Sequence, residues 1–303
     1  MTRILVAGLI NIETTLKVTH FPVEYAPARF PFFGINSTVS GVGFNVSHAL
    51  TVLGNDVSLL ALTGADVGDI LTRDALQKGG VSPHDVLCQM NHTPQSVILY
   101  DPSGMRSIFT DLKDVQEQTY PPERFQQALA GVDLAVLCNI NFARPMLAAT
   151  RAAGVPIATD VHAISDIQDP YNRDYMEHAD ILFQSHENLP CTPEAWINQV
   201  WQHYHAPVVV IGLGGDGALL GVRADEAIEH IPAIYTRPVV SSIGAGDALF
   251  SAFVHLYART GDPYLALRKA IVFASYKIGV AGAADGFLSA PDLDTLYEQV
   301  TSR

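Results

Sequence analysis

The sequence predicts an α/β protein in which a mainly parallel, doubly wound sheet is flanked by helices and carries a small β-sheet lid. Three observations support this prediction: short apolar runs alternate with helical patterns, glycine-rich turns follow some of these runs, and two irregular regions interrupt the first 112 residues. With 303 residues, of which 48% are hydrophobic and 16% charged, the chain is long enough to bury a sizeable core. We expect a single domain over residues 1–303.

The strands of the main sheet are predicted from short apolar runs, which are typical of parallel strands buried on both faces. These runs are residues 4–8, 57–62, 134–137, 157–160, 181–183 and 208–213. Helical patterns lie between them, including residues 45–53, 70–78, 122–130, 145–153 and 193–203. Such an alternation of strands and helices indicates consecutive βαβ units.

Two regions break this alternation and predict the lid. Residues 14–39 are rich in Pro, Phe and Thr, while residues 96–100 and 106–110 flank the turn sequence Asp-Pro-Ser-Gly and predict a hairpin. If the two regions pair, residues of about 12–40 and 93–112 form a small sheet that can close over a ligand. The alternative is two unrelated surface excursions.

Charge and cysteine content restrict the class of partner. The chain has 18 Lys and Arg against 31 Asp and Glu, a net charge of −13, which argues against nucleic acid or an anionic membrane as a partner. No run reaches the roughly 18 apolar residues of a membrane helix. The three cysteines are widely separated and odd in number, so we expect no disulfide framework and a reducing, cytoplasmic location.

The stretch Gly244-Ala245-Gly246-Asp247 is the main candidate for chemistry. A strand-to-helix turn without bulky side chains exposes successive backbone N–H groups at a helix N-terminus, where an anion or a transferring phosphoryl group is stabilised. Asp247 is then placed to take a proton from a substrate hydroxyl. The alternative is that Asp247 only caps the helix.

Two further glycine clusters are candidate ligand turns. The first, GLGGDG at residues 212–217, follows a strand but precedes a strand and hairpin pattern, which favours a turn near nucleotide phosphates over a dinucleotide-binding fingerprint. In the second, Gly41 and Gly43 allow close backbone approach, and Asn45 either bridges ligand hydroxyls or is an ordinary helix N-cap. The histidines, including His162 beside Asp160, complete no metal set and are interpreted as hydrogen-bonding groups.

Taken in order, these motifs resemble those of the ribokinase-like (PfkB) family of carbohydrate and nucleoside kinases over almost the whole chain. GLINIE at 8–13 resembles the family's opening strand, SGVGFN at 40–45 its sugar-binding turn, and LTGADVGD at 62–69 its Gly-x-Asp segment. TPQSVILYDPSGMRS at 93–107 is similar to its lid hairpin, GLGGDG to its nucleotide turn, and SSIGAGDALFSAF at 241–253 to its Asp-Thr-x-Gly-Ala-Gly-Asp block.

The resemblance implies an ATP-dependent kinase that uses Mg²⁺ to bridge the phosphates. It implies Asp247 as the catalytic base, with the amides of Gly244, Ala245 and Gly246 as the anion hole. The residues that it implies for substrate binding are Asn11, Glu13, Gly41, Gly43, Asn45 and Asn141. Those that it implies beside the nucleotide are Gly212, Gly214, Gly217 and Ser275.

The chain also departs from the family's pattern. Glu13 stands where the family has Asp, and Gly212 where it has Thr. Ser241 and Ser242 replace a leading Asp-Thr pair whose Asp holds a monovalent cation in many relatives, so dependence on such a cation is doubtful here. The family's Asn-x-x-Glu metal segment falls in residues 180–190 in one of two registers: Gln184 with Glu187, which keeps the acid for an indirect Mg²⁺ contact, or Ser185 with Asn188, which loses it.

We therefore expect a kinase that transfers the γ-phosphate of ATP to a hydroxyl of a small sugar, and that forms a homodimer through its lid. A nucleoside kinase is the alternative, favoured by the aromatic run ARFPFFG at residues 28–34, which is suited to stacking on a base but equally to a dimer contact. A further alternative is a sugar or nucleotide sensor with impaired catalysis.

Overall fold

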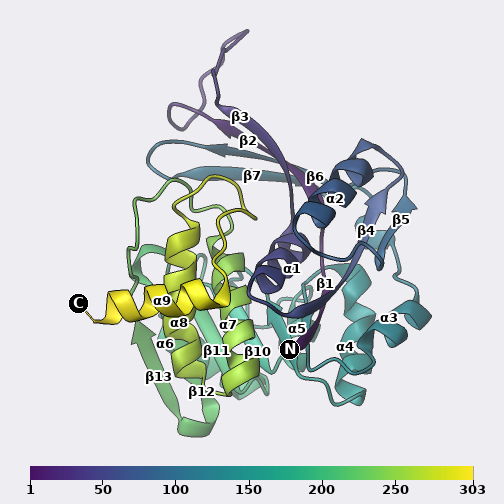
Figure 1. The fold of residues 1–303 in the computed structure, drawn as a ribbon. Coiled ribbons are helices and arrows are strands. Elements are labelled where there is room, and N and C mark those ends of the chain that lie inside the picture. Colours follow the sequence, from purple (N-terminus) through teal and green to yellow (C-terminus); the bar gives the residue numbers. More distant parts are fainter. Residues whose placement is uncertain (303) are drawn as a thin grey trace.

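The main sheet has the predicted parallel core. A computed structural model describes residues 1–302, and in it nine strands pair in the order β13-β12-β11-β10-β9-β8-β1-β4-β5 (Figure 1). Pairing is parallel except at β11–β12 and β12–β13. The strands are β1 (Arg3–Ala7), β4 (Asp56–Gly64), β5 (Val86–Met90), β8 (Leu134–Leu137), β9 (Ile157–Asp160), β10 (Ile181–Ser185), β11 (Val208–Gly212), β12 (Ala218–Val222) and β13 (Ala227–Ile231).

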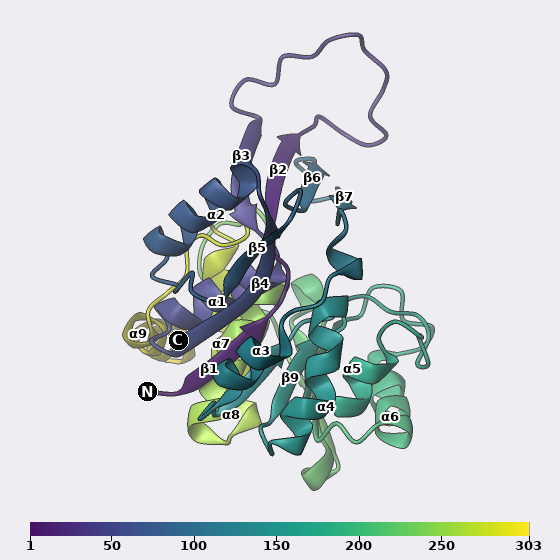
Figure 2. The same ribbon diagram turned by 90° about the vertical axis from the view of Figure 1, so that its right-hand side faces the viewer.

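Helices cover both faces of this sheet, as Figure 2 shows, and each face has its own apolar core. One face is covered by α1 (Val42–Val52), α2 (Val67–Lys78), α7 (Ala245–Thr260), α8 (Pro263–Lys277) and α9 (Ala290–Thr301). The other is covered by α3 (Pro122–Leu129), α4 (Arg144–Ala152), α5 (Arg173–His178) and α6 (Pro193–His203). Because neighbouring parallel strands end at the same edge, the segments that follow β1, β8, β9, β10 and β11 meet there.

A small sheet is built from the two irregular regions, in the order β3-β2-β6-β7. Its strands are β2 (Asn11–Lys17), β3 (Ile35–Ser40), β6 (Gln95–Tyr100) and β7 (Arg106–Asp111). Because β2 pairs with both β3 and β6, the alternative of two unrelated excursions is wrong. One face of the small sheet is buried, with Asn11, Glu13, Ser96 and Ile98 on it. The connection of residues 18–34 projects away from the rest of the chain (Figure 2).

Two helices begin about one turn earlier than the sequence predicted. The helix expected at 45–53 begins at Val42, because Gly41, with a φ of 99°, turns the chain directly after β3. The helix expected at 70–78 begins at Val67, because the side chain of Asp66 accepts a hydrogen bond from Gly68 N and caps it. The N-cap residue of α1 is Gly41, so the interpretation of Asn45 as a helix N-cap is wrong.

The expected strand before Gly244 is also absent from the described residues. The segment of residues 232–244 is irregular, and it packs along the end of α8 instead of joining a sheet. Within residues 1–302, no helix is both long and apolar enough to cross a membrane.

Candidate active site

Asp247 lies in the first turn of α7 and is held by a neighbouring helix. Its Oδ2 accepts a 2.6 Å hydrogen bond from Asn45 Nδ2 on α1. The N-cap residue of α7 is Gly244, with a φ of 74°, and a Cβ there would lie 2.4 Å from Ala283 O. Both conformation and space therefore require glycine at this turn. The result is a carboxylate presented at a helix N-terminus and fixed from outside that helix.

A chain of polar contacts leads from Asp247 to the small sheet. The hydroxyl of Ser40 lies 3.4 Å from Asn45 Oδ1 and donates a 3.1 Å hydrogen bond to Glu13 Oε2. Asn11 Nδ2 donates to Ser96 Oγ at 2.8 Å. The structure thus brings together four predicted residues, Asn11, Glu13, Asn45 and Asp247, from one strand and two helices.

Two buried acceptors of this group find no donor among residues 1–302. They are Asn11 Oδ1 and Glu13 Oε1, on side chains whose residues are 4% and 6% exposed. Leaving a buried acceptor unpaired costs about 1–3 kcal/mol, so such atoms indicate a missing partner. Both atoms accept only, and a ligand that carries neighbouring hydroxyl groups supplies the donors that they lack.

Burial sets the proton affinity of the two carboxylates. It raises the pKa of Asp247 above its ordinary value, and the nearby Asp160 adds to this rise. The Asn45 hydrogen bond and the Lys277 ammonium oppose it. Burial also raises the pKa of Glu13, opposed by the Ser40 hydrogen bond and Lys277 and reinforced by Asp247. A raised pKa makes Asp247 a better proton acceptor, provided that the pH stays above it.

The turn before Asp247 has free space where a ligand can approach. A Cβ on Gly246 would meet no atom of the described chain within 4 Å, so packing does not explain this glycine. The amide of Ala245 donates to Ser242 O at 3.1 Å, and the first i→i−4 bond of the helix is made by Ala248 N. The amides of Gly246 and Asp247 precede that bond, as orphan donors of a helix N-terminus do. This arrangement suits an anion.

Gly41 and Gly43 have a different reason to be glycine. A Cβ on Gly41 would lie 2.5 Å from Leu9 O, and one on Gly43 would lie 2.5 Å from Gly8 C. The N-terminus of α1 thus packs directly against the backbone that joins β1 to β2. These glycines set the position of Asn45 relative to the substrate-side strand β2.

Most of the residues predicted to lie beside the nucleotide, Gly212, Gly214 and Gly217, fall at the end of β11, next to the end of β10. Gly214 has a φ of 61°, and Gly217 has a φ of 98° with no room for a Cβ beside Ile231 O. The segment after β10 joins this turn, since His186 N donates to Gly212 O at 3.0 Å. Glu187 is exposed in that segment, whereas Gln184 is buried in β10.

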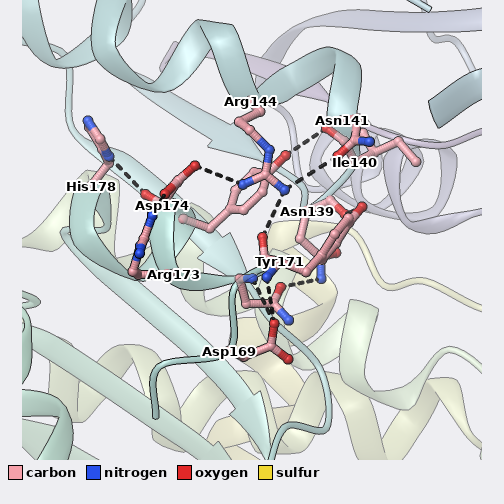
Figure 3. Close-up of polar contacts among 11 residues, drawn as sticks. Asn139, Ile140, Asn141, Arg144, Asp169, Tyr171, Arg173, Asp174 and His178 are labelled. Atoms are coloured by element: carbon pink, nitrogen blue, oxygen red, sulfur yellow. Dashed lines mark hydrogen bonds and ion pairs between the residues drawn. The ribbon is translucent and has the colours of Figure 1, made fainter. Parts of the chain in front are cut away.

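Ser275 and Asn141 are engaged elsewhere. The hydroxyl oxygen of Ser275 accepts a 2.9 Å hydrogen bond from Thr236 N and so holds the segment that leads to Gly244. Asn141 Nδ2 donates to Gln116 O at 3.1 Å. Its Oδ1 accepts from Arg144, which belongs to the network of Figure 3. Within the part described, neither side chain hydrogen-bonds to Asn11, Glu13, Asn45 or Asp247.

Three titratable groups near Asp247 were not assigned to the site from the sequence: His162, beside Asp160, was interpreted only as a hydrogen-bonding group, and Lys277 was not named. Asp160 at the end of β9 and His162 both influence the Asp247 carboxyl, and His162 N donates to Asp160 Oδ1 at 2.8 Å. The third is Lys277, which is fully buried. Lys277 falls at helical spacing with Ala266, Ala270 and Phe273, all buried, and a lysine on such an apolar face was the signal available.

Comparison with known proteins decides the family. The family model described as pfkB family carbohydrate kinase matches residues 1–290. The chain belongs to this family. It is 26% identical over its full length to the ATP-dependent ribose-1-phosphate kinase of Halopiger xanaduensis, covering 99% of that protein. It is also 26% identical to the acarbose 7(IV)-phosphotransferase of an Actinoplanes species, with 94% of this chain and 96% of that protein covered.

Solved structures give the same assignment. A microbiome-derived acarbose kinase superposes with a TM-score of 0.86 at 26% identity, over 98% of each chain. The predicted resemblance and the predicted fold class are therefore confirmed.

Proposed function

We propose that this pfkB family protein transfers the γ-phosphoryl group of ATP to a hydroxyl of a small sugar or sugar derivative. The observation that carries the proposal is the pair of buried, unpaired acceptors on β2, Asn11 Oδ1 and Glu13 Oε1. The Glu13 side chain is linked through Ser40 and Asn45 to Asp247. The relatives named above act on sugars, according to their names, and one is ATP-dependent. Both lines of support favour a carbohydrate acceptor.

Each residue has a defined part in the transfer. Substrate hydroxyls donate to Asn11 and Glu13, which orients one further hydroxyl towards Asp247. Asp247 accepts the proton of that hydroxyl as its oxygen forms the bond to the γ-phosphorus and the bond from phosphorus to the β–γ bridging oxygen breaks, releasing ADP. The first-turn amides at Gly246 and Asp247 face the charge on the transferring group.

Mg²⁺ fits the nucleotide side of this arrangement. Mg²⁺ keeps several waters and is usually held by substrate phosphates and one or two carboxylates. Glu187 is exposed beside the turn of residues 212–217, which suits a contact through water. When bound with ATP, the ion offsets phosphate charge. We propose Gly212, Gly214 and Gly217 as the turn that approaches the nucleotide.

The aromatic run of residues 28–34 does not favour a nucleoside acceptor. Phe30, Phe32 and Phe33 are 79%, 87% and 108% exposed, and they lie on the connection that projects away from the main sheet (Figure 2). A base bound beside Asp247 of the same chain is therefore not stacked by these rings. We propose a sugar acceptor for this reason.

The test is ATP consumption in a coupled assay over matched panels of acceptors. The panels are pentoses, hexoses, ribose-1-phosphate, acarbose and nucleosides, each measured with the wild type and with Asp247→Asn. We expect turnover with members of the sugar panels and its loss in the variant. Turnover confined to nucleosides would replace the sugar assignment. Binding of a sugar without turnover would support a sensor.

We further propose that the small sheet acts as a lid and that two copies pair through it. Its buried side carries Ile98, which packs with Ile243 and Ala283 beside the Asp247 turn. Its other side exposes Val97 at 43% and Phe109 at 59%, an apolar face suited to a second copy. Light scattering of the wild type and of Phe109→Glu tests this. A monomeric wild type would contradict it.

A further inference from the structure

The C-terminal turn of α8 holds the segment that leads into the Asp247 turn. Consecutive residues of this helix end bind consecutive parts of the segment of residues 236–243. Backbone and side-chain bonds join Thr236 N to Ser275 Oγ (2.9 Å), Arg237 Nε to Tyr276 O (2.6 Å), and Val240 N and Ser241 N to Ile278 O (2.8 and 3.1 Å). The conformation of the Gly244 turn therefore depends on the end of α8.

Lys277 adds a charged hydrogen-bond donor to the contact between the end of α8 and the segment of residues 236–243. Its residue is fully buried, and its Nζ donates a hydrogen bond to the carbonyl oxygen of Ile243, the residue directly before Gly244. Ile243 also packs with Ile98 of the small sheet. A buried ammonium is costly unless carbonyl or carboxylate groups surround it, so a lysine at this position needs a reason.

Carboxylates approach the ammonium from three elements. Asp247 on α7, Glu13 on β2 and Asp285 in the loop before α9 each favour its protonated form, whereas burial opposes it. Burial outweighs the carboxylates and lowers the pKa of Lys277 to about 8. Lys277 is thus charged below about pH 8, and in that state it lowers the pKa of Asp247.

We propose that the Lys277 ammonium is a built-in cation that positions the Gly244 turn and replaces a bound monovalent cation. The proposal rests on the kinase function proposed above. The family resemblance implies that many relatives hold a monovalent cation through the leading Asp of this motif; in this chain the position is Ser241, a neutral hydroxyl. The Ile243 carbonyl, a ligand suited to such an ion, already receives the ammonium. The residues present therefore do not fit a mobile cation in addition to Lys277.

The first test uses the wild type alone. Turnover is measured with ATP as its Tris salt in tetramethylammonium buffer, and then with added K⁺, Na⁺ or NH₄⁺. We expect less than about a twofold change, together with a decrease of kcat as the pH rises through about 8, where Lys277 loses its proton. A wild type that requires K⁺ or Na⁺ overturns the proposal.

The second test uses Lys277→Ala, Lys277→Arg and, as a matched control on the same helix, Lys269→Met. Lys269 pairs with Asp294 on α9 and does not contact the Gly244 turn. We expect Lys277→Ala to lower kcat by about 10- to 100-fold, to regain much of it with NH₄⁺, and to move the acidic limb to higher pH, because Asp247 loses a neighbouring positive charge. We expect Lys277→Arg to remove the alkaline limb. Loss of kcat without rescue or a shift of the limb overturns the proposal.

The third test needs no turnover and so separates this proposal from the kinase function. Amide hydrogen exchange is followed in residues 241–247, in the wild type and in the same variants. We expect faster exchange in Lys277→Ala, slowed again by NH₄⁺, and unchanged exchange in Lys269→Met. Equal exchange in the wild type and Lys277→Ala contradicts the positioning role whether or not the wild type phosphorylates a sugar.

Discussion

The proposed substrate side and the proposed nucleotide side of the candidate site differ in how their groups are held. On the substrate side, Asn11 and Glu13 are buried and linked by hydrogen bonds to residues of other elements. On the nucleotide side, Glu187 and Asp216 are exposed, and the turn is defined by its backbone, in which Gly214 and Gly217 have positive φ angles. Side chains shape the first region and main chain shapes the second.

This difference indicates where selectivity resides. A side that leaves buried acceptors unpaired discriminates strongly, because an acceptor molecule without the matching hydroxyl leaves them unpaired in the complex also. A backbone turn at an exposed edge recognises phosphate charge and is less sensitive to any one side chain. Substitutions on the two sides should therefore affect different kinetic constants.

The largest effect on kcat is expected for Asp247, which lies between the two sides. Asp247→Asn keeps the shape of the side chain but removes the proton acceptor, so we expect kcat to fall by about 10³-fold with little change in KM for either substrate. The exposed Asp56, which pairs with Arg3 at 3.5 Å, gives the control Asp56→Asn. Steady-state kinetics of both variants measure this. Retention of wild-type kcat by Asp247→Asn would exclude it as the base.

The next effect tests the substrate side alone. Glu13→Gln replaces the unpaired Oε1 or its neighbour by a donor, which cannot accept from a substrate hydroxyl. We expect kcat/KM for the sugar to fall by about 10- to 100-fold while KM for ATP stays within about twofold of the wild type. Kinetics with each substrate varied separately measure the two constants. An equal loss for sugar and ATP would show that the sides are not independent.

A smaller effect is expected where main chain faces the phosphate. Gly246→Ala adds a methyl group in space that is free of other atoms in the described chain, within the first turn of α7. We expect unfolding free energy to stay equal or to rise by about 0.5 kcal/mol, because alanine favours helix, while kcat/KM for ATP falls about tenfold. Thermal unfolding and kinetics are measured together. A variant that is unchanged in both would place the phosphate elsewhere.

The main sheet was predictable because its strands are buried on both faces. The runs at 134–137 and 157–160 match β8 and β9 to the residue. In contrast, β5 was missed because it is an edge strand whose central residues Cys88 and Gln89 are exposed, which interrupts the apolar run. The segment before Gly244 was expected to be a strand, but its backbone hydrogen-bonds to the end of α8 instead, a contact that periodicity does not reveal.

The candidate site was predictable only for residues that belong to a sequence motif and also contact one another in the structure. Asn11, Glu13, Asn45 and Asp247 were named from motifs, and the structure brings them together. Asn141 was named from the family resemblance, but its side chain binds Gln116 and Arg144. Lys277 lies 30 residues beyond Asp247 and in no motif, so only the packing of α8 against the turn makes its charge relevant.

The smallest effect is expected for the outermost carboxylate of the nucleotide side. Glu187 is exposed, and solvent screens its attraction for a cation, so Glu187→Gln should raise the Mg²⁺ concentration for half-maximal rate by no more than about fivefold, with kcat for the sugar nearly unchanged. Mg²⁺ titrations at fixed ATP measure this, and Glu194→Gln on α6 is the control. A loss as large as that of Asp247→Asn would mean that Glu187 binds the ion directly and that the nucleotide side, too, depends on a side chain.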